Sequence, residues 1–168
     1  DSVVIDTRNE YEIKIGKFGG ALNPHTNSFR EFPAWVKKHL KPLIEENPTL
    51  KIGMYCTGGI RCEKATSLLL ERGYQNTYHL KGGILKYFED IPSNRNKYKG
   101  ECYVFDERVS VDKNLKKGSY SICHACGMPL SVEDKKKLHY IEGVQCHLCI
   151  DKFSDADLSL IHISEPTR

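Results

Sequence analysis

The chain has 168 residues, of which 39% are hydrophobic and 28% are charged, so it can bury one medium core and a small second module. Its net charge of +3 is too small to indicate a nucleic-acid-binding protein by itself. No apolar run approaches the roughly 18 residues that cross a bilayer, and no secretory signal is visible. We therefore expect a cytoplasmic protein with no membrane partner.

Both ends of the chain have unusual sequences. The chain begins directly with an apolar stretch, Val3 to Ile5, and not with a methionine, so we expect its first domain to be truncated at the amino end. At the other end, Leu158–Arg168 resembles the translation of a transposase adapter used in sequencing libraries. We expect this tail to be non-native.

Strand and helix signals alternate through the first hundred residues. The predicted elements are, in chain order, a strand in Ser2–Asp6, a helix in Phe32–Asn47, a buried strand in Leu50–Cys56, a helix from about Ile60 to Arg72 that ends at Gly73, a short strand in Thr77–Gly82, and a helix after Gly82 and Gly83. Strands separated by helices predict an α/β fold, with a mostly parallel sheet and helices on both faces. Ligands of such sheets bind at the carboxyl ends of the strands, where Cys56 falls.

The second half of the chain has a different composition. The polar stretch from Pro92 to Gly100 predicts a loop or linker, and Cys102–Val111 alternates enough to form one or two strands. We therefore expect a first domain at 1–100, connecting strands at 101–118, and a small cysteine-rich module at 119–157.

Cys56 opens the stretch CTGGIR between a predicted strand and a predicted helix. Glycines at 58 and 59 would let backbone N–H groups converge, and the helix N-terminus and Arg61 add positive charge. An isolated buried cysteine is commonly a small hydrophobe, but Gly59 and Arg61 have no evident packing purpose in a plain turn. We interpret Cys56 as catalytic, with its thiolate or persulfide held by an anion-binding loop of Thr57, Gly58, Gly59, Ile60 and Arg61.

This loop resembles the six-residue active loop of rhodanese domains, in which the first cysteine carries a persulfide during sulfur transfer. Two further stretches, Val3–Asn23 and Glu71–Ile84, resemble the early strand with its aspartate-x-arginine turn and the late strand with its double glycine. The resemblance covers about residues 2–90 and implies a rhodanese-like fold. It also implies that the matching charged residues Asp6, Arg8 and Glu12 brace the fold near the loop.

Cys62 lies in the first turn of the helix that follows the loop. It is either a resolving thiol for Cys56 or a cysteine that packs against the sheet. Its position alone does not decide between the two.

Two Cys-x-x-Cys pairs stand nineteen residues apart near the end of the chain. Seven cysteines in a reducing cytoplasm indicate metal ligands or reactive thiols, and four thiolates suit tetrahedral zinc. A module this short also needs metal for its stability, so we expect a zinc-ribbon-like structure. An iron–sulfur cluster or a metal-free redox pair would use the same cysteines, and His124 or His147 could replace one of them. The predicted ligands are Cys123, Cys126, Cys146 and Cys149.

A rhodanese-like part followed by such a cysteine module resembles the rhodanese-containing tRNA uridine 5-hydroxylases. The stretches Phe29–Val36 and Gly100–Val111 carry this resemblance, which spans about residues 2–153. It implies oxygen-dependent 5-hydroxylation of the wobble uridine, with Cys56 as the essential residue. Molecular oxygen would be the co-substrate, and tRNA and an unidentified electron or sulfur donor would be the partners. One departure is Gly127, where the family carries a basic residue.

Two other functions stay open. The chain could be a sulfurtransferase of the thiosulfate:acceptor type, or a non-catalytic adaptor that binds RNA or protein. The lysines in 113–117 and 135–137 could contact phosphates or form a solvated face, and their pattern favours the solvated face.

Overall fold

A computed structural model describes residues 1–163, so the end of the predicted non-native tail, 164–168, lies outside the described residues. The chain divides into two compact units, which we describe separately. The first comprises Asp1–Val104 and Val111–Lys116, and the second comprises Phe105–Ser110 and the residues from Lys117 onward. The predicted boundary near Gly100 falls just before Val104, whereas the predicted connecting segment 101–118 is shared between the units.

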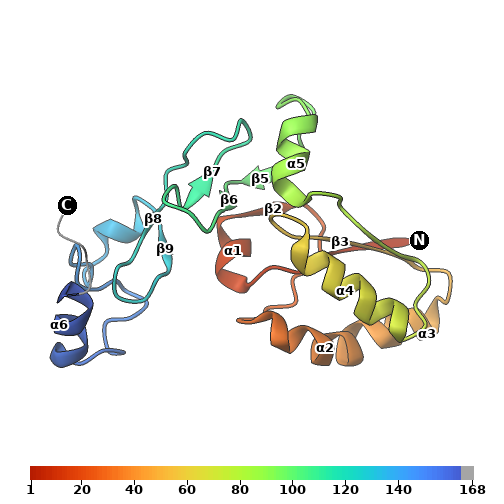
Figure 1. Ribbon diagram of the computed structural model, residues 1–168, viewed down its shortest axis with the longest axis horizontal. Coiled ribbons are helices and arrows are strands. Elements are labelled where there is room, and N and C mark those ends of the chain that lie inside the picture. The colour runs from red at the N-terminus through yellow and green to blue at the C-terminus, as the bar shows by residue number, and fades with distance from the viewer. Residues whose placement is uncertain (164–168) are drawn as a thin grey trace. The chain divides into compact units, whose positions relative to one another are not determined.

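The first unit is built on a parallel sheet of three strands in the order β1-β3-β4 (Figure 1). In its register Val3 pairs with Ile52, and Ile52 with Thr77. The predicted α/β class with a parallel sheet is confirmed. The elements up to residue 111 are β1 (Ser2–Asp6), α1 (Glu10–Ile15), β2 (Gly16–Phe18), η1 (Phe29–Glu31), α2 (Phe32–Trp35), η2 (Val36–Leu40), α3 (Lys41–Glu46), β3 (Lys51–Tyr55), α4 (Ile60–Glu71), β4 (Thr77–His79), α5 (Gly83–Asp90), β5 (Tyr98–Gly100), β6 (Cys102–Tyr103) and β7 (Ser110–Val111).

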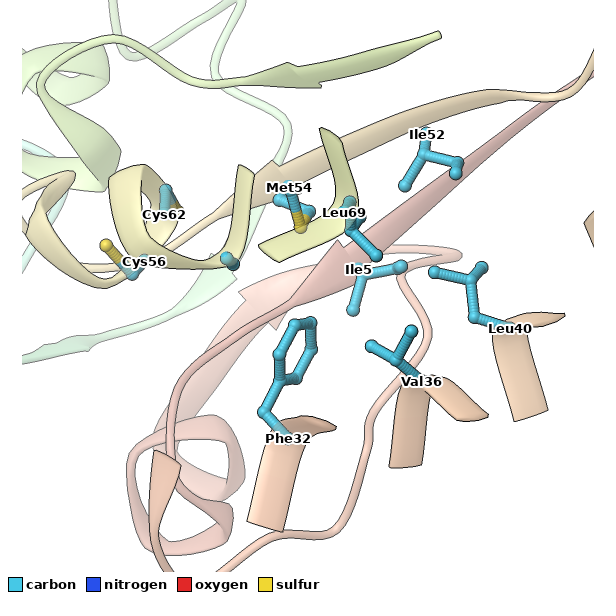
Figure 2. Packing of buried hydrophobic residues seen from close by; sticks show 10 residues of the cluster. Ile5, Phe32, Val36, Leu40, Ile52, Met54, Cys56, Cys62 and Leu69 are labelled. Atoms are coloured by element: carbon cyan, nitrogen blue, oxygen red, sulfur yellow. The ribbon is translucent and has the colours of Figure 1, made fainter. Parts of the chain in front are cut away.

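Helices cover both faces of this sheet, as predicted (Figure 1). Met54 of the central strand packs in a cluster with side chains of α2, η2 and α4, several of which Figure 2 shows. Tyr55, the next residue, packs in a second cluster with Ile84 and Phe88 of α5. Successive side chains of a strand point to opposite faces, so α2 and α4 lie on one face and α5 on the other.

The predicted helix in Phe32–Asn47 forms as three consecutive segments, of which the middle one, η2, is a π-helix. Pro42 lies in the first turn of α3, directly after it. Proline has no N–H group, and its ring clashes with the carbonyl group four residues before it. A π turn has a wider hydrogen-bonding spacing than an α turn. It therefore lets the helix continue through Pro42 despite the missing N–H group and the bulk of the ring.

The prediction of a loop over Pro92–Gly100 is wrong for Tyr98–Gly100. These residues form β5, which pairs antiparallel with β2. Tyr98 is completely buried there, and its ring packs edge-on against Phe18 and Phe88, with centroids 5.1 Å apart in each case. The polar neighbours of Tyr98 dominate the composition of this stretch, but its single aromatic side chain fixes the conformation.

The second unit has a small core around its cysteines, which Leu130, Tyr140 and Phe153 complete. Its helix α6 includes the first residues of the predicted non-native tail. Within the described part of the chain, no helix is long and apolar enough to span a membrane. The elements of this unit are β8 (Ser121–Ile122), β9 (Pro129–Leu130), η3 (Asp134–Lys136) and α6 (Asp155–Ile163).

The double glycine lets α5 approach the segment that follows β3. Gly82 and Gly83 have φ angles of 71° and 67°, in the left-handed region that favours glycine. A Cβ atom on Gly83 would clash with the carbonyl oxygen of Thr57 and lie 2.6 Å from that of Cys56. The N–H group of Ile84 donates to the Cys56 carbonyl at 3.0 Å. Hence the start of α5 packs against the backbone carbonyl groups of Cys56 and Thr57 and supports them.

We predict that Gly83→Ala lowers the free energy of unfolding of the first unit by roughly 3 kcal/mol, because it combines left-handed strain with overpacking. Gly73→Ala is the matched control, since its φ of 87° imposes similar strain but no atom lies within 4 Å of its Cβ position. This control should lose only about 1 kcal/mol. Urea unfolding followed by the fluorescence of Trp35, the one tryptophan of the chain, measures both, and equal losses would contradict the packing argument.

Candidate active site and candidate metal centre

Cys56 lies at the carboxyl end of the central strand β3, directly before the loop that leads to α4. Its side chain is buried, with 1% of the residue exposed, and the N–H group of Gly59 donates to its Sγ atom at 3.1 Å. Gly59 has a φ of 95°, whereas a Cβ on Gly58 would meet no atom within 4 Å. The conformation therefore demands glycine at position 59 and gives no steric reason for it at 58. Ile60 is 72% exposed on the outer side of the loop.

The surroundings of Cys56 favour its thiolate. A hydrogen bond with the Cys62 thiol is the largest cause that lowers the pKa of Cys56, to about 5, against the opposing effect of burial. The backbone N–H groups of Cys62 and Gly59 lower it further, and the charge of Arg61 adds a smaller effect. These surroundings thus favour the thiolate, the nucleophilic form of cysteine, at neutral pH.

Arg61 forms an ion pair with the carboxylate of Glu12, a contact that the sequence did not reveal. Its two terminal nitrogens donate to the Glu12 carboxylate at 2.6 and 2.8 Å, and the Glu12 side chain is completely buried. This bidentate pair offsets much of the guanidinium charge that we expected to act on the anion. The pair also agrees with the small effect of Arg61 on the pKa of Cys56.

Glu12 joins α1 to both ends of the loop. Besides Arg61, it accepts a hydrogen bond from the Thr57 hydroxyl at 3.4 Å and one from the Asn9 N–H group at 3.1 Å. Asn9 caps α1, so the same carboxylate fixes the helix start. Glu12 thereby braces the loop, as the resemblance implied.

Asp6 and Arg8 form a second buried pair next to this brace. The Arg8 Nε and Nη2 atoms donate to the two oxygens of Asp6 at 2.9 and 2.7 Å, and Nη2 also donates to the Gly16 carbonyl at 2.7 Å. Arg8 is completely buried. Its contacts go to the protein itself, which assigns it a structural role in the turn after β1.

Three groups around the loop have roles that the sequence did not reveal. Gly83 supports the loop backbone, Thr7 contacts Cys62 at 3.6 Å, and Cys62 contributes to the ionisation of Cys56. Cys62 is completely buried in the core and its pKa is raised, first by the hydrogen bond with Cys56 and then by burial, so it keeps its proton. The double glycine was visible as a motif, but a threonine gives no sequence signal of this kind.

The second unit brings the four predicted ligand cysteines together. Their sulfur atoms all lie within 4.8 Å of one another, and three of the separations are 3.7, 3.7 and 3.9 Å. Sulfur atoms around one tetrahedral zinc ion, at about 2.3 Å from it, would lie about 3.8 Å apart. The arrangement therefore fits one metal ion held by four thiolates. In an iron–sulfur cluster the four thiolates are divided between two or four iron atoms, so they would not all lie this close together.

The two histidines of the cysteine pairs do not belong to this cluster of four sulfur atoms. His147 instead places its Nε2 atom 3.1 Å from the Lys137 amine and 3.7 Å from Asp134. Gly127 has a φ of 73°, and its N–H group donates to the Cys123 carbonyl at 2.8 Å. This tight turn explains locally why glycine follows Cys126.

We predict that Glu12→Gln destabilises the first unit by about 3 kcal/mol, because it leaves the partly buried Arg61 without its counter-charge. Glu89→Gln is the control, since it breaks an exposed pair with Lys86 and should cause no measurable change. Urea unfolding followed by Trp35 fluorescence checks both variants. A Glu12→Gln variant as stable as the control would show that the brace contributes nothing.

Comparisons with known proteins agree with this geometry. The model of the rhodanese-like domain family matches residues 1–90. A protein of Prochlorococcus marinus strain NATL1A named "tRNA uridine(34) hydroxylase" is 69% identical over 157 residues, which are 94% of this chain and 49% of the relative. Proteins of the same name from strains MIT 9215 and MIT 9313 are 58% and 53% identical over 94% of this chain and 51% of each relative.

The chain thus spans about half the length of the curated relatives it matches. The family match covers more than half of the chain and includes the parallel sheet, the Cys56 loop and the double glycine. The chain belongs to the rhodanese-like domain family.

Proposed function

We propose that the protein to which this chain belongs hydroxylates uridine 34, the wobble base of tRNA, at carbon 5 with molecular oxygen as co-substrate. The observation that carries the proposal is the 69% identity to a relative of that name over 94% of this chain. The ionised Cys56 in its braced loop supports it, because it supplies a reactive group in the part of the protein at hand. The proposal includes a cytoplasmic location, where tRNA is present.

In this proposal Cys56 is the reactive residue and passes through a persulfide. Its thiolate attacks the outer sulfur of a donor such as thiosulfate, the S–S bond of the donor breaks, and sulfite leaves with the electron pair. The product is Cys56–S–S⁻, whose charge lies on the outer sulfur. The N–H group of Gly59 donates to the inner Sγ atom, and the positive end of the α4 dipole favours negative charge near it.

The proposal predicts the loss of one modified nucleoside. Deletion of the intact gene should remove 5-hydroxyuridine and its derivatives from tRNA, as mass spectrometry of tRNA nucleosides measures. Complementation with the wild-type gene should restore them, and Cys56→Ser should not. Glu89→Gln is the control, because it changes an exposed side chain outside the Cys56 loop, so it should restore them as well. Unchanged 5-hydroxyuridine after deletion would overturn the proposal.

A plain sulfurtransferase is the second candidate, and the low pKa of Cys56 within a rhodanese loop favours it. Robust turnover of thiosulfate and cyanide, with no change in tRNA nucleosides, would select this function. An adaptor that binds RNA or protein is the third candidate. It would be selected if Cys56→Ser left all measured functions intact.

We further propose that the four cysteines of the second unit hold a structural zinc ion. The carrying observation is the set of sulfur separations near 3.8 Å, which one tetrahedral ion explains. When bound, zinc would supply folding free energy to a unit with a small apolar core.

Metal analysis of the purified chain should therefore find about one zinc per chain. Cys146→Ser should lower the zinc content and the thermal stability of the second unit, whereas Cys102→Ser, in the first unit, should leave the zinc content unchanged. Purified wild-type chain that is folded and metal-free would contradict the assignment.

A further inference from the structure

Arg61 is the one basic residue of the loop CTGGIR, and its partner Glu12 is saturated with hydrogen bonds. The Oε1 atom of Glu12 accepts from Arg61 Nη2 at 2.8 Å and from the Thr57 hydroxyl at 3.4 Å. Its Oε2 atom accepts from Arg61 Nη1 at 2.6 Å and from the Asn9 N–H group at 3.1 Å. A carboxylate has about four acceptor sites on its two oxygens. No site is left for a proton, so Glu12 carries a full negative charge.

This negative charge lies beside Cys56. Glu12 binds Thr57, the residue directly after Cys56, as well as Arg61 at the other end of the loop. The Glu12 side chain is completely buried and that of Arg61 is 20% exposed. Water and salt therefore screen the pair less than they screen a pair on the surface. The two charges compensate each other within the protein.

The next charged side chains along the chain do not restore a positive charge. Glu63, in the first turn of α4, and Lys64 after it are both exposed and have opposite signs. With Glu12 included, the charged side chains of the loop and of the start of α4 therefore have no net charge. The attraction for an anion comes from dipoles, namely the Gly59 N–H group, 3.1 Å from the Cys56 sulfur, and the positive end of α4.

The charge of a sulfur donor matters at such a loop. Thiosulfate carries two negative charges, so its encounter with the Cys56 thiolate brings three negative charges together. An uncompensated guanidinium group would offset part of this repulsion, but the bidentate contact with Glu12 removes that effect. A donor with one negative charge, or none, meets much less repulsion.

We propose that Glu12 is a positioning residue that sets the donor preference of Cys56. By compensating Arg61, it makes the loop favour small sulfur donors with at most one negative charge, such as an alkyl persulfide, over the thiosulfate dianion. The proposal rests on the function proposed above, because it takes Cys56 as the reactive thiolate.

The transfer from an alkyl persulfide needs no further reactant. The Cys56 thiolate attacks the outer sulfur of R–S–SH, and the S–S bond of the donor breaks. R–S⁻ leaves with the electron pair and takes up the proton of the outer sulfur as R–SH. Cys56–S–S⁻ remains, as in the reaction with thiosulfate.

The test uses two alkylating probes that differ in charge, iodoacetate and neutral iodoacetamide, on the full chain, with peptide mass spectrometry to resolve Cys56. Both probes react with the same thiolate, so the ratio of their rates does not depend on the pKa of Cys56. Glu12→Gln leaves Arg61 uncompensated and should raise the iodoacetate:iodoacetamide ratio about fivefold, the effect of one unit charge at about 4 Å in water. Glu12→Asp keeps the charge and should keep the ratio near the wild-type value.

A double variant keeps the test decisive if Glu12→Gln does not fold. Glu12→Gln/Arg61→Gln removes both charges and leaves no buried charge unpaired, which is the costly state. Its ratio should equal that of the wild type, because a compensated pair and no pair have the same net charge. Glu89→Gln, in an exposed pair, is the control and should also leave the ratio unchanged.

The donors themselves give a second readout. Persulfide formation on Cys56 is followed by peptide mass spectrometry with thiosulfate and with cysteine persulfide. Glu12→Gln should raise the rate with thiosulfate relative to the rate with cysteine persulfide. A purely structural role of Glu12 would slow both donors alike and leave this relative rate unchanged.

Three results would overturn the proposal. The first is a folded Glu12→Gln variant with the wild-type ratio of probes, and the second is an unchanged relative rate of the two donors in that variant. The third is a double variant whose ratio falls well below the wild type, since this would show that Arg61 acts as an uncompensated cation. The assays contain no RNA, so their outcome is independent of whether the protein hydroxylates tRNA.

Discussion

The ion pair between Glu12 and Arg61 is the interaction on which the geometry of the Cys56 loop depends. A carboxylate that is completely buried is stable only with a counter-charge and hydrogen bonds, and Glu12 obtains both from the loop and from the start of α1. The loop depends on Glu12 in turn, because the same contacts hold Thr57 and Arg61 in place. Helix α1 and the loop therefore stabilise each other's position, although Glu12 and Cys56 are 44 positions apart in the sequence.

This pairing separates two tasks that the sequence analysis assigned together to Arg61, holding the loop and attracting an anion. Arg61 mainly holds the loop, while the stabilisation of negative charge on Cys56 comes mainly from a thiol and from backbone N–H groups. Such dipoles are fixed by the fold and neutral overall. They can favour an anionic sulfur without attracting other anions as strongly as a free guanidinium group would.

Much of the fold and of the site could be predicted from local patterns. The strand in Ser2–Asp6 and the helix after Ile60 follow from β-branched runs and helical spacing, and the cluster of four cysteines follows from the spacing of the two Cys-x-x-Cys pairs. Contacts that depend on tertiary structure could not be predicted in this way. The partner of Arg61 lies far away in sequence, and Tyr98 forms β5 only because an aromatic cluster exists to receive it. Gly58 and Gly59 look alike in the sequence. Only the backbone conformation shows that position 59 requires glycine and position 58 does not.

The burial of Cys56 has a consequence for what its sulfur can reach. With 1% of the residue exposed, the Sγ atom lies beneath the protein surface, and a large substrate such as a folded RNA cannot come into contact with it. In the proposed persulfide, a second sulfur atom bonded at about 2.05 Å would lengthen the side chain. The bound sulfur would then act as a removable extension of the residue, which carries its reactivity to the surface only after the protein has been loaded.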